Sequence, residues 1–153
     1  MTLLFNQAAV LAAVALAGLV SPVPGRPVEG ITLEVRLVGL RSDQGSARVA
    51  LWRTREGFPN DSEKAARRYS LPIVDGVADI VIEGLEPGDW AIAAFHDEND
   101  NGRLDTRMFG IPKEGVAVSR DARGRFGPPS FEQAKVQLAG RRPQTITLRV
   151  VYP

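Results

Sequence analysis

The chain of 153 residues has no cysteine and a single histidine, His96. Without thiols, the protein can form no disulfide, no thiolate metal site and no cysteine nucleophile. A transition-metal site built from several histidines is also excluded, and a serine triad would have to use His96. We therefore predict a protein that is not an enzyme, with no catalytic residues and no organic cofactor.

An excess of charge of one sign is also missing. The 19 Lys and Arg residues oppose 18 Asp and Glu residues, which leaves a formal net charge of +1. Such a balance gives no strong field that would attract nucleic acid. With 44% hydrophobic residues, the chain has enough apolar side chains for the core of one ordinary domain. We expect a single domain, a monomer and no nucleic-acid partner.

The N-terminal segment has the features of a secretory signal. The first 20 residues carry no charged side chain, and an apolar run from Ala8 to Val20 precedes the proline-rich stretch SPVPGRPVEG. The run is short for a membrane-spanning helix, and a buried N-terminal helix is the alternative because no Lys or Arg precedes it. We predict a signal peptide and linker over residues 1–29, export to the periplasm or the medium, no transmembrane domain in the mature protein, and one folded domain over residues 30–153.

Beyond Ile31, hydrophobic and polar residues alternate in short runs, which is typical of strands with one face exposed to water. ITLEVRLVGL is the clearest run, and we expect it to form a first hairpin with SARVALWR. A second hairpin is expected around Asp75 and Gly76, because both residues tolerate the positive φ of a tight turn. Further strands are predicted in DWAIAAFHD, KVQLAG and TITLRVVY.

Helix signals are few. Residues 60–69 and 128–135 combine cap residues with helix formers. The stretch 97–134 is longer than ordinary loops, which favours an ordered or functional loop, and GVAVS predicts a short strand inside it. The fold class that follows is all-β: a single antiparallel β-sandwich, immunoglobulin- or transthyretin-like, with about seven strands, one long ordered loop and one or two short helical turns. Phe95, Phe109, Phe126 and Phe131 bracket the long loop and are expected to anchor it.

The most specific pattern in the chain is DENDNGRLD, which starts at Asp97 and reads D-x-N-x-N-G-x-x-D. Oxygen-bearing side chains at alternate positions, followed by a glycine that permits a sharp turn, are typical of calcium loops. The predicted ligands are the side chains of Asp97, Asn99, Asn101 and Asp105 and the backbone carbonyl of Arg103. Glu98 and Asp100 occupy the intervening positions and are expected to point outward.

The predicted ion is Ca²⁺ in a structural role, because the donors are hard oxygens on a flexible loop. The site should be weak, since Met108 stands at the twelfth position, where an EF-hand has a bidentate glutamate, and a strand precedes the loop. Glu114 is the candidate for a further ligand. A solvated turn is the alternative, because β-turns also favour Asn, Asp and Gly.

Two functions are compatible with this loop. The favoured one is an exported, non-catalytic β-sandwich module of the cell envelope that presents a surface to a glycan or an envelope protein. The alternative is a small-ligand-binding protein or enzyme in which His96, Asp97 and Glu114 line a pocket at the loop end of the sandwich. Because His96 and Asp97 should point to opposite faces of a strand, they are poorly placed to act as a catalytic pair.

Three motifs follow one another in the second half of the chain: LEPGDWAIAAFHDENDNGRLD, FGIPKEGVAVS and FGPPSFEQAKVQL. In order and spacing they resemble the bacterial domain-of-unknown-function family 2141, over about residues 31–152. The resemblance implies an exported β-sandwich without an established activity. It also places the metal loop at Asp97, Asn99, Asn101, Gly102 and Asp105, with His96 beside it.

Overall fold

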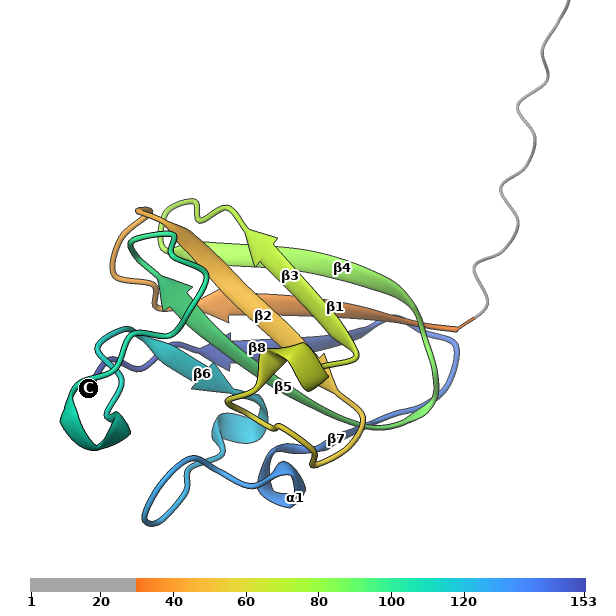
Figure 1. Cartoon of the computed structure of the whole chain (residues 1–153). Helices are drawn as coiled ribbons and strands as arrows, with labels where there is room; N and C mark the ends of the chain where they lie inside the picture. Colours follow the sequence, from red (N-terminus) through yellow and green to blue (C-terminus); the bar gives the residue numbers. More distant parts are fainter. Residues whose placement is uncertain (1–29) are drawn as a thin grey trace, which may run out of the picture.

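The computed structural model describes residues 30–153, and the predicted signal peptide and linker over residues 1–29 lie outside the described residues. Two β-sheets pack face to face in this part of the chain (Figure 1). The strands are β1 Ile31–Val38, β2 Ser46–Trp52, β3 Arg67–Leu71, β4 Val77–Leu85, β5 Gly88–Asp97, β6 Val116–Val118, β7 Val136–Leu138 and β8 Gln144–Arg149. The prediction of an all-β sandwich is confirmed.

The two sheets divide the strands unevenly. One sheet has the order β4-β1-β8, and the other has the order β3-β2-β5-β6, with β7 also paired to β5. The strands β6 and β7 share one edge of β5, since β7 pairs with Gly88–Trp90 and β6 with Ala93–Phe95. The loop between β5 and β6 therefore leaves from the end of the central strand β5 and returns beside it.

Both predicted hairpins are wrong, although the second turn is present. β1 pairs with β4 and β8, whereas β2 pairs with β3 and β5, so the chain changes sheets between β1 and β2. The turn at Asp75 and Gly76 forms with φ angles of 52° and 73°, but the strands on either side of it lie in different sheets. Turn residues specify a local reversal of the chain, whereas strand partners depend on packing across the sandwich.

The sandwich is also not wholly antiparallel. β1 and β8 run parallel, with Leu33 opposite Gln144 and Val38 opposite Arg149. A parallel pair needs a long crossover connection, and here most of the domain lies between the two strands. Alternation of apolar residues predicts a strand without giving its direction, which is why the sequence pattern missed this pair.

The main core lies between the two sheets. Ile31, Leu33, Val35 and Leu37 alternate along β1 and are buried there against side chains of β2 and β5. A smaller core covers the outer face of β2 and β5, where Trp52 packs edge-on against Phe58. Because full burial of one such side chain contributes roughly 1.5–3 kcal/mol, these cores hold the strands that carry the long loop.

Helical structure is limited to single turns. α1 Phe131–Ala134 begins with a capping box between Ser130 and Gln133, which confirms the helical turn predicted in residues 128–135. The 3-10 turns are η1 Ser62–Lys64, η2 Met108–Gly110 and η3 Ser119–Asp121. The helix predicted over residues 60–69 shrinks to η1 because the following residues pair with β2 as strand β3. Among residues 30–153, no helix has the length and apolar character that crossing a bilayer requires.

The predicted loop anchors divide into two groups. Phe131 is 8% exposed and packs into the smaller core, as expected. Phe109 and Phe126 are each 94% exposed, so the prediction that they anchor the loop is wrong. The backbone turns that carry these two rings project them away from both cores.

Candidate metal centre

The candidate ligands lie on the loop that starts where β5 ends. β5 pairs with β2 up to its last residue, with Ala47 opposite His96 and Ser46 opposite Asp97. Because successive side chains of a strand point to opposite faces, His96 and Asp97 face different sides of the sheet. The two side chains accordingly contact different parts of the protein.

Asp97 organises the start of the loop. Its side chain is 0% exposed, and its Oδ1 accepts the N–H of Asn101 at 3.0 Å. Its Oδ2 accepts the N–H of Gly102 at 2.8 Å and the Nε–H of Arg48 at 2.9 Å. These hydrogen bonds offset the cost of burying a carboxylate and fix the turn in which Gly102 has a φ of 78°.

The other three predicted side-chain ligands converge on one another. Nδ2 of Asn99 donates to Oδ2 of Asp105 at 2.9 Å, and Nδ2 of Asn101 donates to Oδ1 of Asp105 at 3.2 Å. The amide oxygens of Asn99 and Asn101 accept the backbone N–H groups of Asn101 and Arg103, at 3.2 and 2.8 Å. The side chain of Arg103 is exposed, so its backbone is the part that belongs to the turn.

Glu114 closes the loop from its far side. The residue is 4% exposed, and its Oε1 and Oε2 accept the N–H groups of Glu98 and Asp105, each at 3.0 Å. One carboxylate thus holds the backbone at both ends of the loop 97–105. The sequence suggested Glu114 as a further ligand or as part of a pocket, and the structure adds this role as a clamp.

The two intervening acids anchor the loop to the sandwich, Glu98 as a half-buried side chain and Asp100 as an exposed one. Glu98 accepts hydrogen bonds from Nε and NH2 of Arg41 at 2.7 and 2.5 Å. The hydrogen bond with Arg41 lowers the pKa of Glu98 below its ordinary value. Asp100 accepts the hydroxyl proton of Ser46 at 2.7 Å. The hydrogen bonds of both acids are thus made with residues of the sandwich.

His96 is enclosed on the other side of the sheet. It is 0% exposed, with Nδ1 at 2.7 Å from Oη of Tyr152 and Nε2 at 2.7 Å from the carbonyl oxygen of Gln44. Because a carbonyl only accepts, Nε2 carries a proton. Burial raises the pKa of Tyr152, whose hydroxyl also accepts the N–H of Arg41 at 2.9 Å. His96 thus joins β5 to the C-terminal segment and to the connection between β1 and β2.

The chemistry of the donor set fits Ca²⁺. Two carboxylates, two amides and one backbone carbonyl are hard oxygen donors, which Ca²⁺ prefers. Lone pairs remain on these oxygens, because each Asp105 oxygen accepts one amide hydrogen and Oδ1 of Asp97 accepts one N–H. Within residues 30–153, no three His, Asp or Glu side chains gather into a metal-binding cluster, so any ion depends on the asparagines. Met108, at the twelfth position, is 78% exposed and offers no oxygen.

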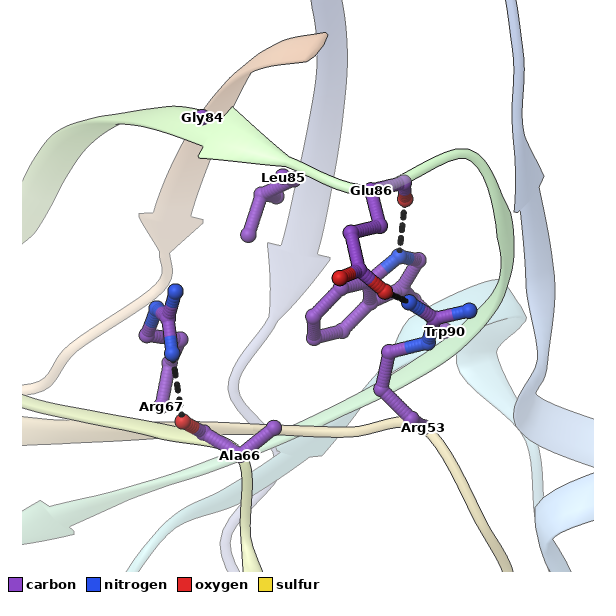
Figure 2. Close-up of a pocket in the computed structure, with 7 residues that line it drawn as sticks. All are labelled: Arg53, Ala66, Arg67, Gly84, Leu85, Glu86 and Trp90. Atoms are coloured by element: carbon purple, nitrogen blue, oxygen red, sulfur yellow. Dashed lines mark hydrogen bonds and ion pairs between the residues drawn. The ribbon is translucent and has the colours of Figure 1, made fainter. Parts of the chain in front are cut away.

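Two hollows in the described surface lie away from this loop. One, of about 230 Å³, is lined in part by Arg53, Arg67, Glu86 and Trp90 (Figure 2). There the guanidinium of Arg53 lies 5.1 Å from the centre of the Trp90 ring and forms an ion pair with Glu86. The other hollow lies on the β4-β1-β8 sheet. Pockets for small molecules usually measure about 300–1,000 Å³, and neither hollow is lined by His96, Asp97 or Glu114.

Three residues that attach the loop to the sandwich were not predicted from the sequence: Arg41, Arg48 and Tyr152. Arg48 gave a usable signal, because it is the one charged residue in the strand SARVALW and such a charge usually has a partner. Arg41 and Tyr152 gave none, since 111 positions separate them along the chain. Their contact depends on the fold as a whole.

Comparison with protein families agrees with the three sequence motifs in the second half of the chain. A family model described as "Uncharacterized protein conserved in bacteria (DUF2141)" matches residues 35–147. Searches of curated proteins and of solved structures gave no match. The matched region runs from β1 into β8 and contains the loop 97–105, His96 and Glu114. The chain belongs to the DUF2141 family of uncharacterised bacterial proteins.

Proposed function

We propose that the protein is an exported, non-catalytic β-sandwich module whose loop 97–105 binds a structural Ca²⁺ ion. The observation that carries the proposal is the convergence of Asn99 and Asn101 on Asp105, in a turn fixed by the buried Asp97. Export is supported by the uncharged apolar run near the N-terminus. The classes of partner that we favour are a glycan and a protein of the cell envelope.

The side chains of Asp97, Asn99, Asn101 and Asp105 and the carbonyl of Arg103 would hold the ion. Calcium would offset the charge of the two carboxylates and replace the amide hydrogens that now face Asp105. With two formal charges among the ligands, we expect a Kd in the weak class, about 10⁻⁴ to 10⁻³ M. An ion that binds only the folded protein adds about 1.4 kcal/mol to the free energy of unfolding at a tenfold excess over Kd.

The contacts of His96 and Glu114 support a non-catalytic role. Both ring nitrogens of His96 and both carboxylate oxygens of Glu114 are hydrogen-bonded to other groups of the protein. A general acid or base must instead reach a substrate proton directly or through one water. These two side chains serve better to hold the loop in place.

Calorimetric titration of Ca²⁺ into three forms of the full chain tests the proposal: the wild type, Asp105→Asn and Asp100→Asn. Asp105→Asn removes one negative charge from the centre of the ligand cluster. Asp100→Asn removes the same charge from the same loop, at a residue that contacts Ser46 and, at 3.9 Å, Arg48 instead of the other candidate ligands. We expect Asp105→Asn to weaken binding at least about tenfold, or 1.4 kcal/mol, and Asp100→Asn to change it far less.

Two results would contradict calcium binding at this loop. The first is no heat of binding from the wild type at millimolar calcium. The second is equal weakening by both variants, which would show only general attraction to a negative surface. Thermal unfolding with calcium and with a chelator gives an independent check, because specific binding must raise the melting temperature of the wild type.

A further inference from the structure

In the loop between β5 and β6, the second half, residues 106–113, exposes large apolar side chains, and we refer to it as the apolar tip. Met108 is 78% exposed, Phe109 is 94% exposed and Ile111 is 48% exposed. Figure 1 shows the turn η2 at the far end of this loop, away from both sheets. Apolar side chains that face water as a cluster often mark an interaction site, whereas single exposed apolar side chains are normal.

The backbone of the tip turns Phe109 outward. Phe109 has φ 64° and ψ 21°, which lie in the left-handed region that bulky residues rarely adopt. Gly110 follows with a φ of 72°. Unfavourable conformations of this kind are retained mainly at functional sites. The conformation therefore favours a role for the exposed ring.

The tip satisfies several of its own backbone hydrogen bonds. The N–H of Arg107 donates to the carbonyl of Ile111 at 2.7 Å, and the N–H of Gly110 donates to the carbonyl of Arg107 at 3.2 Å. At the base, the N–H of Lys113 donates to the carbonyl of Asp105 at 2.8 Å. A segment that enters an apolar medium must pair its backbone groups internally. The tip meets this requirement at these positions.

Three cationic side chains flank the exposed apolar group. Arg103, Arg107 and Lys113 are all exposed, and none of them forms a salt bridge with an acid in the described part of the chain. By contrast, Arg41 and Arg48 are paired with acids of the metal loop. The tip therefore combines exposed apolar side chains with unpaired positive charge.

We propose that the apolar tip docks onto a lipid surface with anionic headgroups. Met108, Phe109 and Ile111 enter the boundary between headgroups and acyl chains, and Arg107 and Lys113 contact the phosphates, as the long stems of basic side chains permit. A stable protein interface usually buries about 800 Å² on each partner, which three side chains on a convex turn do not supply. Shallow insertion into lipid needs only a few apolar side chains together with basic ones.

The proposal goes beyond calcium binding, because none of the five residues assigned to the lipid contact is a predicted ligand. The test uses Phe109→Trp in the full chain as a local fluorescent probe. The native Trp52 and Trp90 are 1% and 3% exposed, so their emission should not respond to a surface contact. Val81→Trp is the matched control, since Val81 is 60% exposed and lies on β4 in the opposite sheet. Each variant is mixed with phosphatidylcholine vesicles, with and without phosphatidylglycerol, in chelator and in calcium.

We expect the emission of Phe109→Trp to shift to shorter wavelength with anionic vesicles and to be quenched by brominated lipid, while Val81→Trp does neither. The shift should occur in chelator, which separates this proposal from calcium binding. Adding Arg107→Gln and Lys113→Gln should lower the partition coefficient of Phe109→Trp about thirtyfold, from about 1 kcal/mol per basic residue.

Four results would overturn the proposal. One is an unchanged emission of Phe109→Trp, and another is an equal response of Val81→Trp. Equal shifts with neutral and anionic vesicles would remove the role of the headgroup charge. A shift that grows with protein concentration in the absence of vesicles would identify a second copy of the chain as the occupant of the tip.

Discussion

The two halves of the loop between β5 and β6 are opposite in character. In residues 97–105, the acidic side chains accept hydrogen bonds from the protein, and Arg48 and Arg41 tie two of them to neighbouring segments. In residues 106–113, apolar side chains face water, and the cations form no salt bridge with an acid of residues 30–153. The hydrogen bonds of the polar half fix the conformation of the loop, whereas the apolar tip exposes its side chains to solvent.

This difference shows how a long loop remains ordered while it exposes residues that water disfavours. Backbone hydrogen bonds to Glu114 and Asp97 fix the base, so the tip is held in place without packing its own side chains. Substitutions in the polar half should therefore change stability. Substitutions in the tip should change binding and leave stability nearly unaltered.

The largest loss of stability is expected from Asp97→Ala. The change removes a fully buried acceptor of three hydrogen bonds and leaves Arg48 without its closest acid. We expect the free energy of unfolding, measured by urea denaturation in chelator, to fall by about 3 kcal/mol. Asp97→Asn keeps an oxygen acceptor and should cost less. An effect of Asp97→Ala below about 1 kcal/mol would show that the polar half does not hold the loop.

Glu114→Ala should have the next largest effect. It leaves the N–H groups of Glu98 and Asp105 without their acceptor in a partly buried region. Because two partly buried N–H donors would then lack a hydrogen-bond acceptor, we expect the free energy of unfolding to fall by about 2 kcal/mol. Glu114→Gln retains one acceptor oxygen and should lose about half as much. Equal losses from the two variants would contradict the clamp, because the remaining oxygen would then have no value.

Gly102→Ala tests the backbone of the metal loop by itself. Gly102 has a φ of 78°, and a methyl group added there would meet no atom within 4 Å. The cost should therefore come from the left-handed conformation alone, about 1 kcal/mol in the free energy of unfolding. Calorimetry of the same variant should show weaker calcium binding if the turn must keep this shape. An unchanged stability would mean that the loop adapts to the new residue.

The sequence predicted these parts of the molecule unequally. The alternating pattern identified most of the strands, and the spacing of the acidic loop identified Asn99, Asn101 and Asp105, whose side chains do come together, because both signals are local. The pairing of β1 with β4 and β8, and the contact of Arg41 with Tyr152, depend on long-range packing that no local pattern records. The exposed tip was missed for a different reason: aromatic residues are usually buried, and Phe109 is an exception.

The smallest effect is expected from Phe109→Gly, and its sign matters more than its size. Glycine relieves the left-handed strain at φ 64°, and this gain exceeds the cost of its greater freedom in the unfolded chain, so the free energy of unfolding should rise by about 0.5 kcal/mol. Met108→Gly, at a neighbouring residue without a positive φ, should instead lower it by about 0.5 kcal/mol. The first variant should also lose affinity for anionic vesicles, measured with a tryptophan at Ile111. If Phe109→Gly is more stable and binds lipid more weakly, Phe109 contributes to lipid contact and not to folding. If Phe109→Gly is less stable, the Phe109 side chain contributes to the stability of the fold.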